Sequence, residues 1–199
     1  MIPVLEQSEP ADFDAKVRQK GLAFLRKKGI ALDQPLPDKA DIAPYWRDCL
    51  DDLHSLYHGC CAYLAIFIER VTGDASVDHF IAKSKQADLA YEWSNYRLAC
   101  LTMNSRKRNY DDVLDPFSVQ SGWFHLELVS GRIYPNSNLP SNTKKQIEET
   151  IERLHLDDAG NREIRSRHYY EYAAKGYPTD YLKTRSPFVY TEALRQGLL

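Results

Sequence analysis

The stretch from Val77 to Asn109 reads VDHFIAKSKQADLAYEWSNYRLACLTMNSRKRN, and the rest of the chain is interpreted around it. Asp78 and His79 stand together in one short apolar run, Asn95 lies in a second, and Asn104 opens a basic segment. Carboxylate and amide oxygens are ligands for a hard divalent cation. An imidazole can take a proton from water near neutral pH, and cationic side chains bind phosphate. These residue types together indicate hydrolysis of a phosphodiester.

The same stretch predicts two strands and a helix. A turn at Thr72–Asp74 leads into a strand at Ser76–Phe80, whose expected partner is Asn95–Ala99. A helix is expected to begin near Asn104 and to be broken by Asp115-Pro116, because a residue before proline disfavours the helical conformation.

The order of these residues resembles the HNH family of metal-dependent nucleases. Its ββα-metal motif runs Asp-His, then Asn, then Cys-x-x-Cys-Asn-x-x-Lys, and here Asp78-His79, Asn95 and Cys100 to Lys107 stand at those positions. The flanks, including the end of the chain, resemble a subgroup that contains the HNH component of the Septu antiphage system. Most of the chain is covered by the resemblance, but only the central motif is specific.

The resemblance implies a role for each motif residue. Asp78 and the amide oxygen of Asn104 would hold Mg²⁺ or another divalent cation, and His79 would take a proton from the attacking water. Asn95 would orient the imidazole through its amide oxygen, and the product would carry a 5′-phosphate. The clustered cations are expected to bind nucleic acid, with DNA favoured over RNA: Lys83, Lys85, Arg97, Arg106, Lys107 and Arg108.

The zinc pairs of the family are degenerate in this chain. Members with a structural zinc carry two Cys-x-x-Cys pairs, but Leu64 and Met103 replace the second cysteine of each. Cys61 and Cys100 remain as half-pairs, so these positions cannot supply four thiolates. We expect an apolar plug at this site and no structural zinc.

The remaining chain predicts a mainly helical scaffold. An extended arm, Met1–Glu9, precedes an expected helix at Pro10–Lys28, a linker to Pro44 and a second helix at Tyr45–Tyr57. The segment Cys60–Arg70 is helical or extended. Beyond the motif we expect a β-hairpin formed by residues 124–129 and 132–134. A helix at Thr143–Leu156, with a Thr143/Gln146 capping box, should follow it. We then expect a helix at Arg162–Ala174 and a short final helix. The fold class is therefore α+β, an HNH core within one domain of 199 residues whose segments are 1–57, 58–116 and 117–199.

Composition sets limits on function. The chain is 43% hydrophobic and 27% charged, with a net charge of −2 and no apolar run of transmembrane length. The start lacks a signal-peptide pattern, and four cysteines form no secreted disulfide framework. We expect a cytoplasmic protein that does not bind membranes.

Three functions remain open. The first is a Mg²⁺-dependent endonuclease, which the Septu resemblance implies to be a defence effector controlled by a partner ATPase. The second is a non-catalytic nucleic-acid-binding or assembly module on the same scaffold. The third is a small-molecule or protein-binding domain whose Asp-His pair is structural. Taken singly, Asn95 could cap a strand, Asn104 could cap a helix, and Arg106–Arg108 could form a solvated face.

Overall fold

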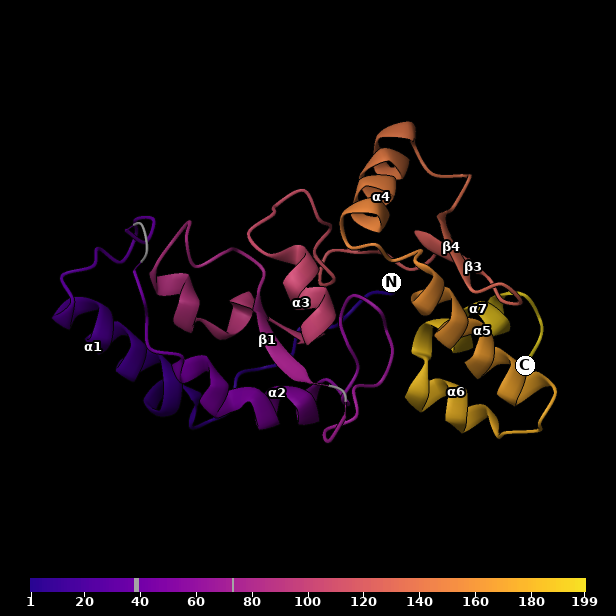
Figure 1. Ribbon diagram of the computed structural model, residues 1–199, viewed down its shortest axis with the longest axis horizontal. Coiled ribbons are helices and arrows are strands. Elements are labelled where there is room, and N and C mark those ends of the chain that lie inside the picture. The colour runs from indigo at the N-terminus through magenta and orange to yellow at the C-terminus, as the bar shows by residue number, and fades with distance from the viewer. Residues whose placement is uncertain (38–39, 73) are drawn as a thin grey trace. The chain divides into compact units, whose positions relative to one another are not determined.

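The computed structural model describes residues 1–37, 40–72 and 74–199, and it has a mixed α+β fold (Figure 1). The predicted fold class is confirmed at this level. Within the described residues, two antiparallel sheets occur, each with two strands. None of the helices in these ranges is long and apolar enough to span a membrane. Residues 38 and 39 of the expected linker and Gly73 of the expected turn lie outside the described ranges.

The chain divides into two compact units. The N-terminal unit comprises Glu6–Gly59 and Glu69–Asp111, and the C-terminal unit comprises Met1–Leu5, Cys60–Ile68 and Asp112–Leu199. The predicted segments 1–57, 58–116 and 117–199 differ from these units, because residues 1–5 and 60–68 pack with the C-terminal part of the chain. Whether the whole chain is one domain stays a prediction.

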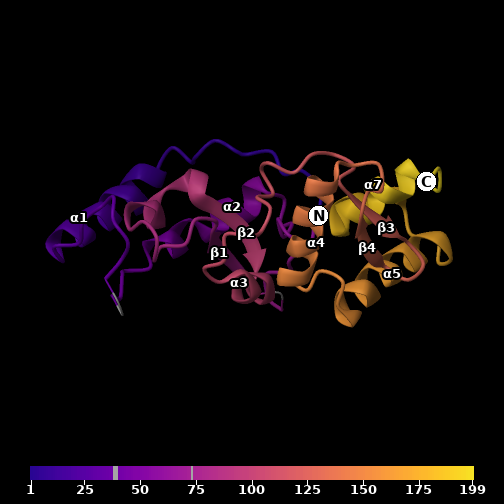
Figure 2. The ribbon, with the colours of Figure 1, turned by 90° about the horizontal axis from the view of Figure 1, so that it is seen from above.

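The N-terminal unit contains the predicted central stretch. Its elements are η1 (Asp14–Arg18), α1 (Gln19–Lys27), η2 (Tyr45–Cys49), α2 (Leu50–Leu56), β1 (Ala75–His79), η3 (Asp88–Tyr91), η4 (Trp93–Asn95), β2 (Tyr96–Cys100) and α3 (Leu101–Lys107). The two helical segments predicted before the linker and after Pro44 are confirmed, although each begins with a non-α turn. Figure 2 shows β1, β2 and α3 beside one another within this unit.

The predicted pairing of the two strands, β1 with β2, is confirmed, and it is antiparallel, with each strand displaced by one residue from its predicted range. Asp78 pairs with Arg97, and His79 pairs with Tyr96. The helix α3 starts at Leu101, directly after β2, and not near Asn104 as predicted. Its end was also predicted wrongly: Arg108, with a φ of 50°, ends the helix well before Pro116. Asn104 therefore lies in the middle of α3.

Aromatic side chains form the core of the N-terminal unit. The Phe13 ring meets the edges of Trp93 and Tyr96, with centroid distances of 5.4 and 5.9 Å. Gly21 lets α1 lie directly against the ring of Tyr91, because a Cβ atom at position 21 would be only 2.1 Å from Cγ of Tyr91. Since Tyr91 belongs to η3, this contact places η3 against α1.

The C-terminal unit contains a second hairpin and a helical layer. Its elements are β3 (Phe124–Glu127), β4 (Arg132–Pro135), α4 (Ser141–Arg153), α5 (Ala159–Ala173), α6 (Thr179–Arg185) and α7 (Pro187–Arg195). The predicted hairpin is confirmed. The capping box was wrong, since α4 begins after Pro140 without a side-chain cap. Residues 60–68 form turns with a single bridge between Cys60 and Phe67, and the tail forms two helices where one was expected.

Buried charges join the layers of the C-terminal unit. The guanidinium of Arg165 on α5 donates to the carbonyls of Gly131 and Leu156, each at 2.8 Å. The carboxylate of Glu192 on α7 accepts the backbone N–H of Leu126 at 2.8 Å. Both side chains are almost completely buried, so their hydrogen bonds compensate for the loss of hydration.

Candidate active site

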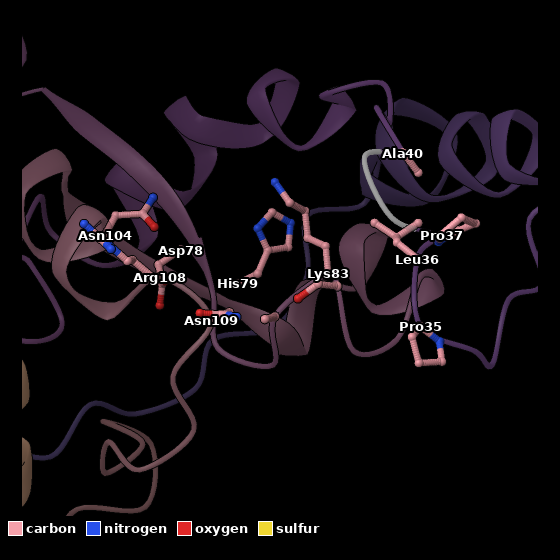
Figure 3. A pocket seen from close by; sticks show the side chains of 12 residues that line it. Pro35, Leu36, Pro37, Ala40, Asp78, His79, Lys83, Asn104, Arg108 and Asn109 are labelled. Carbon is pink, nitrogen blue, oxygen red and sulfur yellow. The ribbon is translucent and has the colours of Figure 1, made fainter.

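Five of the predicted site residues line one pocket of about 600 Å³ (Figure 3). Asp78 and His79 are the last residues of β1, and Asn104 comes from the middle of α3. The loop after β1 adds Lys83, and the residues after α3 add Arg108. The direct passage from β2 into α3 puts the amide of Asn104 beside the end of β1. Residues that carry a carboxylate, an imidazole, an amide and two cationic groups thus line one pocket.

Asp78 is held by a buried cation. Its carboxylate, 1% exposed, lies 3.6 Å from the ammonium of Lys107, which is fully buried. The same ammonium donates to the carbonyls of His79 at 3.0 Å and Phe80 at 2.8 Å. Lys107 therefore connects α3 to the end of β1, and its charge compensates that of Asp78.

His79 is oriented by a backbone carbonyl. Its Nε2 lies 3.0 Å from the carbonyl oxygen of Ala90. Because a carbonyl can only accept, Nε2 carries the proton, and Nδ1 is the nitrogen that can accept one. Burial lowers the pKa of His79 to about 3, and the charges of Lys83 and Lys107 act in the same direction while the bond to Ala90 opposes them. The imidazole is thus neutral at neutral pH.

The orientation of His79 by Asn95, expected from the resemblance, is not found. The amide oxygen of Asn95 accepts the backbone N–H of Ile81 at 2.7 Å, and its Nδ2 donates to the carbonyls of Ile81 and Leu89, both at 2.9 Å. The side chain is 5% exposed. Asn95 consequently closes the loop between β1 and β2, and it fixes Leu89 next to the carbonyl that orients His79.

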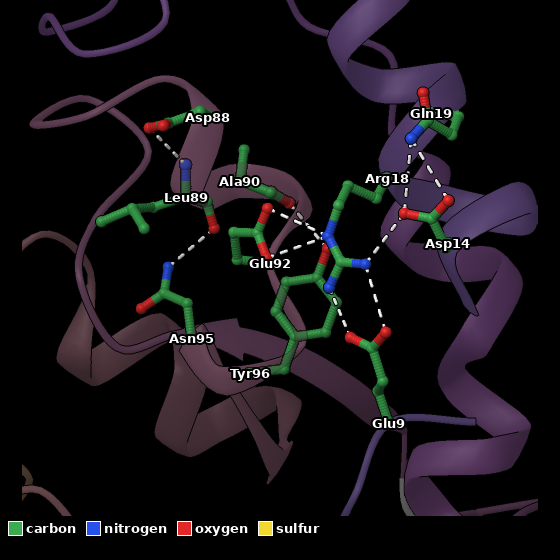
Figure 4. A network of polar contacts seen from close by, with 10 residues as sticks. All are labelled: Glu9, Asp14, Arg18, Gln19, Asp88, Leu89, Ala90, Glu92, Asn95 and Tyr96. Atoms are coloured by element: carbon green, nitrogen blue, oxygen red, sulfur yellow. Dashed lines mark hydrogen bonds and ion pairs between the residues drawn. The ribbon is translucent and has the colours of Figure 1, made fainter. Parts of the chain in front are cut away.

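One residue missed in the sequence, Tyr96, supports the same carbonyl (Figure 4). The Tyr96 hydroxyl donates to Ala90 at 2.7 Å, so Tyr96 and His79 share one acceptor. The carboxylate of Glu92, two residues further along, accepts from Arg18 at 3.0 Å. A backbone carbonyl has no sequence signature. Tyr96, which pairs with His79 across the hairpin, was the available signal.

The predicted phosphate-binding cations fall into three groups. Lys83 and Arg108 line the pocket. Lys85 and Arg106 lie outside it, with Lys85 paired to Asp111. Arg97 and Lys107 are buried, and both donate to backbone carbonyls: Arg97 bonds Ser94 at 2.8 Å and Tyr96 at 2.9 Å. The two buried cations stabilise the fold in this structure and do not face solvent.

In Figure 3, Lys83 lies beside His79, between Arg108 at one end and Leu36 at the other. Its ammonium lies 4.4 Å from the ring centroid of Trp46, within the range of a cation–π interaction. Burial lowers the pKa of Lys83, the nearby Arg47 adds to this effect, and Asp41 and Asp78 oppose it.

The donor set fits a hard divalent cation. Nδ2 of Asn104 donates to the Ser76 hydroxyl at 3.1 Å and to the Val77 carbonyl at 3.2 Å, which leaves the amide oxygen as its potential ligand atom. With the Asp78 carboxylate, this gives two hard oxygens, and Mg²⁺ commonly completes its shell with water and substrate phosphate. The described residues contain no group of three or more His, Cys, Asp or Glu side chains that could hold a metal, but a site of this kind does not require one.

The degenerate zinc positions belong to different units. Cys61 lies in the C-terminal unit and Cys100 at the end of β2 in the N-terminal unit, and neither forms a disulfide. Met103 is fully buried and Leu64 is half-buried. The expected apolar plug stays a prediction.

The chain matches no protein-family model, and no curated protein is significantly similar to it.

Proposed function

We propose that the pocket is the active site of a metal-dependent nuclease of the HNH type, with β1, β2 and α3 as its ββα-metal core. One observation carries this proposal: Asn104, distant in sequence from the adjacent Asp78 and His79, lines the same pocket as they do. The pairing of β1 with β2 and the start of α3 directly after β2 agree with the motif. The HNH resemblance supplies the reaction class.

Each residue then has a chemical role. The Asp78 carboxylate and the Asn104 amide oxygen would hold a divalent cation, which when bound stabilises negative charge on the phosphate and the leaving oxygen. Nδ1 of His79 accepts the proton of the attacking water, while Nε2 stays bonded to Ala90. Lys83 and Arg108 bind phosphate oxygens from the pocket wall.

The low pKa of His79 affects how well this residue can accept the proton of the attacking water. A buried imidazole with a pKa of about 3 is unprotonated at neutral pH but is a weak base. A phosphate in the pocket adds negative charge near the ring, which raises the pKa of His79.

A second candidate is a nucleic-acid-binding or assembly module without catalysis. It is favoured by the buried Lys107 ammonium, which already compensates the charge of Asp78. DNA as the preferred substrate, a defence role, an ATPase partner and a cytoplasmic location rest on the sequence alone and remain proposals.

Cleavage assays separate the two candidates. Plasmid, single-stranded DNA and RNA are incubated with the purified protein in Mg²⁺, Mn²⁺ or EDTA. The nuclease proposal expects metal-dependent cleavage that His79→Ala abolishes without loss of nucleic-acid binding. His125→Ala is the matched control, because His125 lies on β3 of the other unit and should leave cleavage unchanged. Binding without cleavage under every metal condition would favour the second candidate.

A further inference from the structure

The pocket has an apolar end that the hydrolytic groups do not use. Pro35, Leu36, Pro37 and Ala40 line it together with the polar residues. In Figure 3 these side chains lie at one end, Asn104 and Arg108 lie at the other, and His79 and Lys83 lie between them. A ligand that fills the whole pocket needs a charged part and an adjoining apolar part.

The segment that carries the apolar end is bonded to η3. The backbone N–H of Ala87 donates to Gln34 at 3.0 Å, and that of Asp88 donates to Leu32 at 3.1 Å. After the apolar residues, the Ala43 carbonyl accepts the Tyr91 hydroxyl at 2.9 Å. The same η3 carries the carbonyl of Ala90 that orients His79. One short helix therefore supports both the apolar end and the proposed base.

Lys83 lies between the polar and the apolar end of the pocket, where it can bind a phosphate. Its ammonium is held near Trp46 and close to His79, where a phosphate would lie next to the attacking water. A nucleic-acid strand continues from each phosphate into a sugar and a base. The sugar and base next to the bound phosphate are the parts that can reach Leu36 and its neighbouring prolines.

The apolar end can use only an unpaired base. The faces of a paired base within a duplex are covered by neighbouring bases, so proteins that contact base faces act on unstacked or single-stranded nucleotides. Proline rings and a leucine side chain offer apolar contact to such a face but no hydrogen-bond donors to read a base edge.

We infer that this pocket binds an unpaired nucleotide, with its phosphate at the polar end and its base against Pro35, Leu36 and Pro37. The ligand class is single-stranded or locally opened nucleic acid, bound with little base selectivity. This inference rests on the proposed function and deepens it by naming the form of the substrate.

The test compares strands of equal charge in the full-length protein. Fluorescence anisotropy in EDTA, where the proposed metal-dependent cleavage does not occur, measures binding of oligothymidylate and of an abasic strand with the same number of phosphates. Phosphate contacts are common to both strands, so the difference reports the base contact. We expect about tenfold tighter binding of oligothymidylate, which is the order of magnitude of one buried base contact.

Variants locate the contact. Leu36→Ala should reduce the preference for bases to about threefold, since removal of the side chain loses part of the apolar contact. Leu101→Ala is the matched control, because Leu101 is an exposed leucine of the same unit outside the pocket. It should retain the full preference.

The outcomes distinguish this inference from the proposed function. Equal affinity for both strands, an unchanged preference in Leu36→Ala, or tighter binding of the matching duplex would overturn the inference while leaving a phosphodiesterase possible. Failure to bind any nucleic acid at low salt would overturn the inference and the proposed function together.

Discussion

Replacement of Lys107 by methionine should strongly destabilise the N-terminal unit. The ammonium is fully buried, lies 3.6 Å from the carboxylate of Asp78, and donates to the carbonyls of His79 and Phe80. Methionine retains much of the length and volume of the side chain but supplies neither the charge nor the donors. The variant therefore removes this cation from beside a buried carboxylate and this donor from two carbonyls.

The magnitude follows from these contacts. Removal of one partner of a buried ion pair costs about 3–5 kcal/mol, because the remaining charge stays buried. The two carbonyls lose hydrogen bonds to a charged donor, but solvent or small shifts can replace part of that loss. We therefore expect a decrease of about 3–5 kcal/mol in the free energy of unfolding, a large part of the roughly 5–15 kcal/mol that a domain possesses.

Urea unfolding followed by circular dichroism measures this change. Lys145→Met is the control, since Lys145 lies on α4 in the other unit, is 77% exposed and should change stability by less than about 0.5 kcal/mol. The double variant Asp78→Asn/Lys107→Met removes both charges and should recover part of the loss. A loss below about 1 kcal/mol in Lys107→Met would refute the structural role given to this ammonium.

Three further predictions concern the same unit. The pKa of His79 is about 3 in the folded chain, below the ordinary value of 6.5, so the unfolded chain binds more protons between these values and stability falls as pH decreases from about 6.5. In urea titrations at successive pH values, the free energy of unfolding should change with pH more steeply in wild type than in His79→Gln, by up to about 1.4 kcal/mol per pH unit. Equal slopes in the two proteins would contradict the burial of this imidazole. Asn95→Ala should lower the free energy of unfolding by about 2–4 kcal/mol, because the three hydrogen bonds of this side chain to the loop are lost. Calorimetry that finds no change in stability would show that Asn95 does not hold the loop between β1 and β2. Gly21→Ala should destabilise the protein by at least about 1–3 kcal/mol, because the added Cβ would overlap Tyr91. Gly160→Ala is the control: a Cβ there has nothing within 4 Å, so this variant should be neutral or stabilising. Equal melting temperatures for the two variants would disprove the packing of Gly21 against Tyr91.

The local elements could be predicted because their signals are local. The apolar runs around Val77 and Leu98 gave the β1–β2 hairpin, and the turn at Ser130-Gly131 gave the β3–β4 hairpin. The start of α3 was missed because the helix follows β2 directly at Leu101, without an intervening turn. The end of α3 was missed because a left-handed residue at Arg108, and not a proline, ends the helix.

The sequence predicted residues that line the pocket, but it did not predict the hydrogen bonds and ion pairs that these residues make. The motif order brought Asp78, His79 and Asn104 to attention, and these residues line one pocket. The sequence did not reveal that Lys107 and Arg97 are buried, because a basic segment has the same composition whether its side chains face solvent or backbone carbonyls. Nor did it reveal the carbonyl of Ala90, since a backbone acceptor depends on the path of the chain and not on residue type.

The most direct test of the central claim is cleavage of nucleic acid by His79→Ala with and without added imidazole, in Mg²⁺ or Mn²⁺. If Nδ1 of His79 accepts the proton of the attacking water beside Asp78 and Asn104, the variant loses at least about a hundredfold in rate, the usual order of a general-base contribution. Imidazole that enters the vacated space should then restore part of the rate, and it should have no effect on wild type. Cleavage by His79→Ala at the wild-type rate, or the absence of metal-dependent cleavage by wild type, would contradict the account.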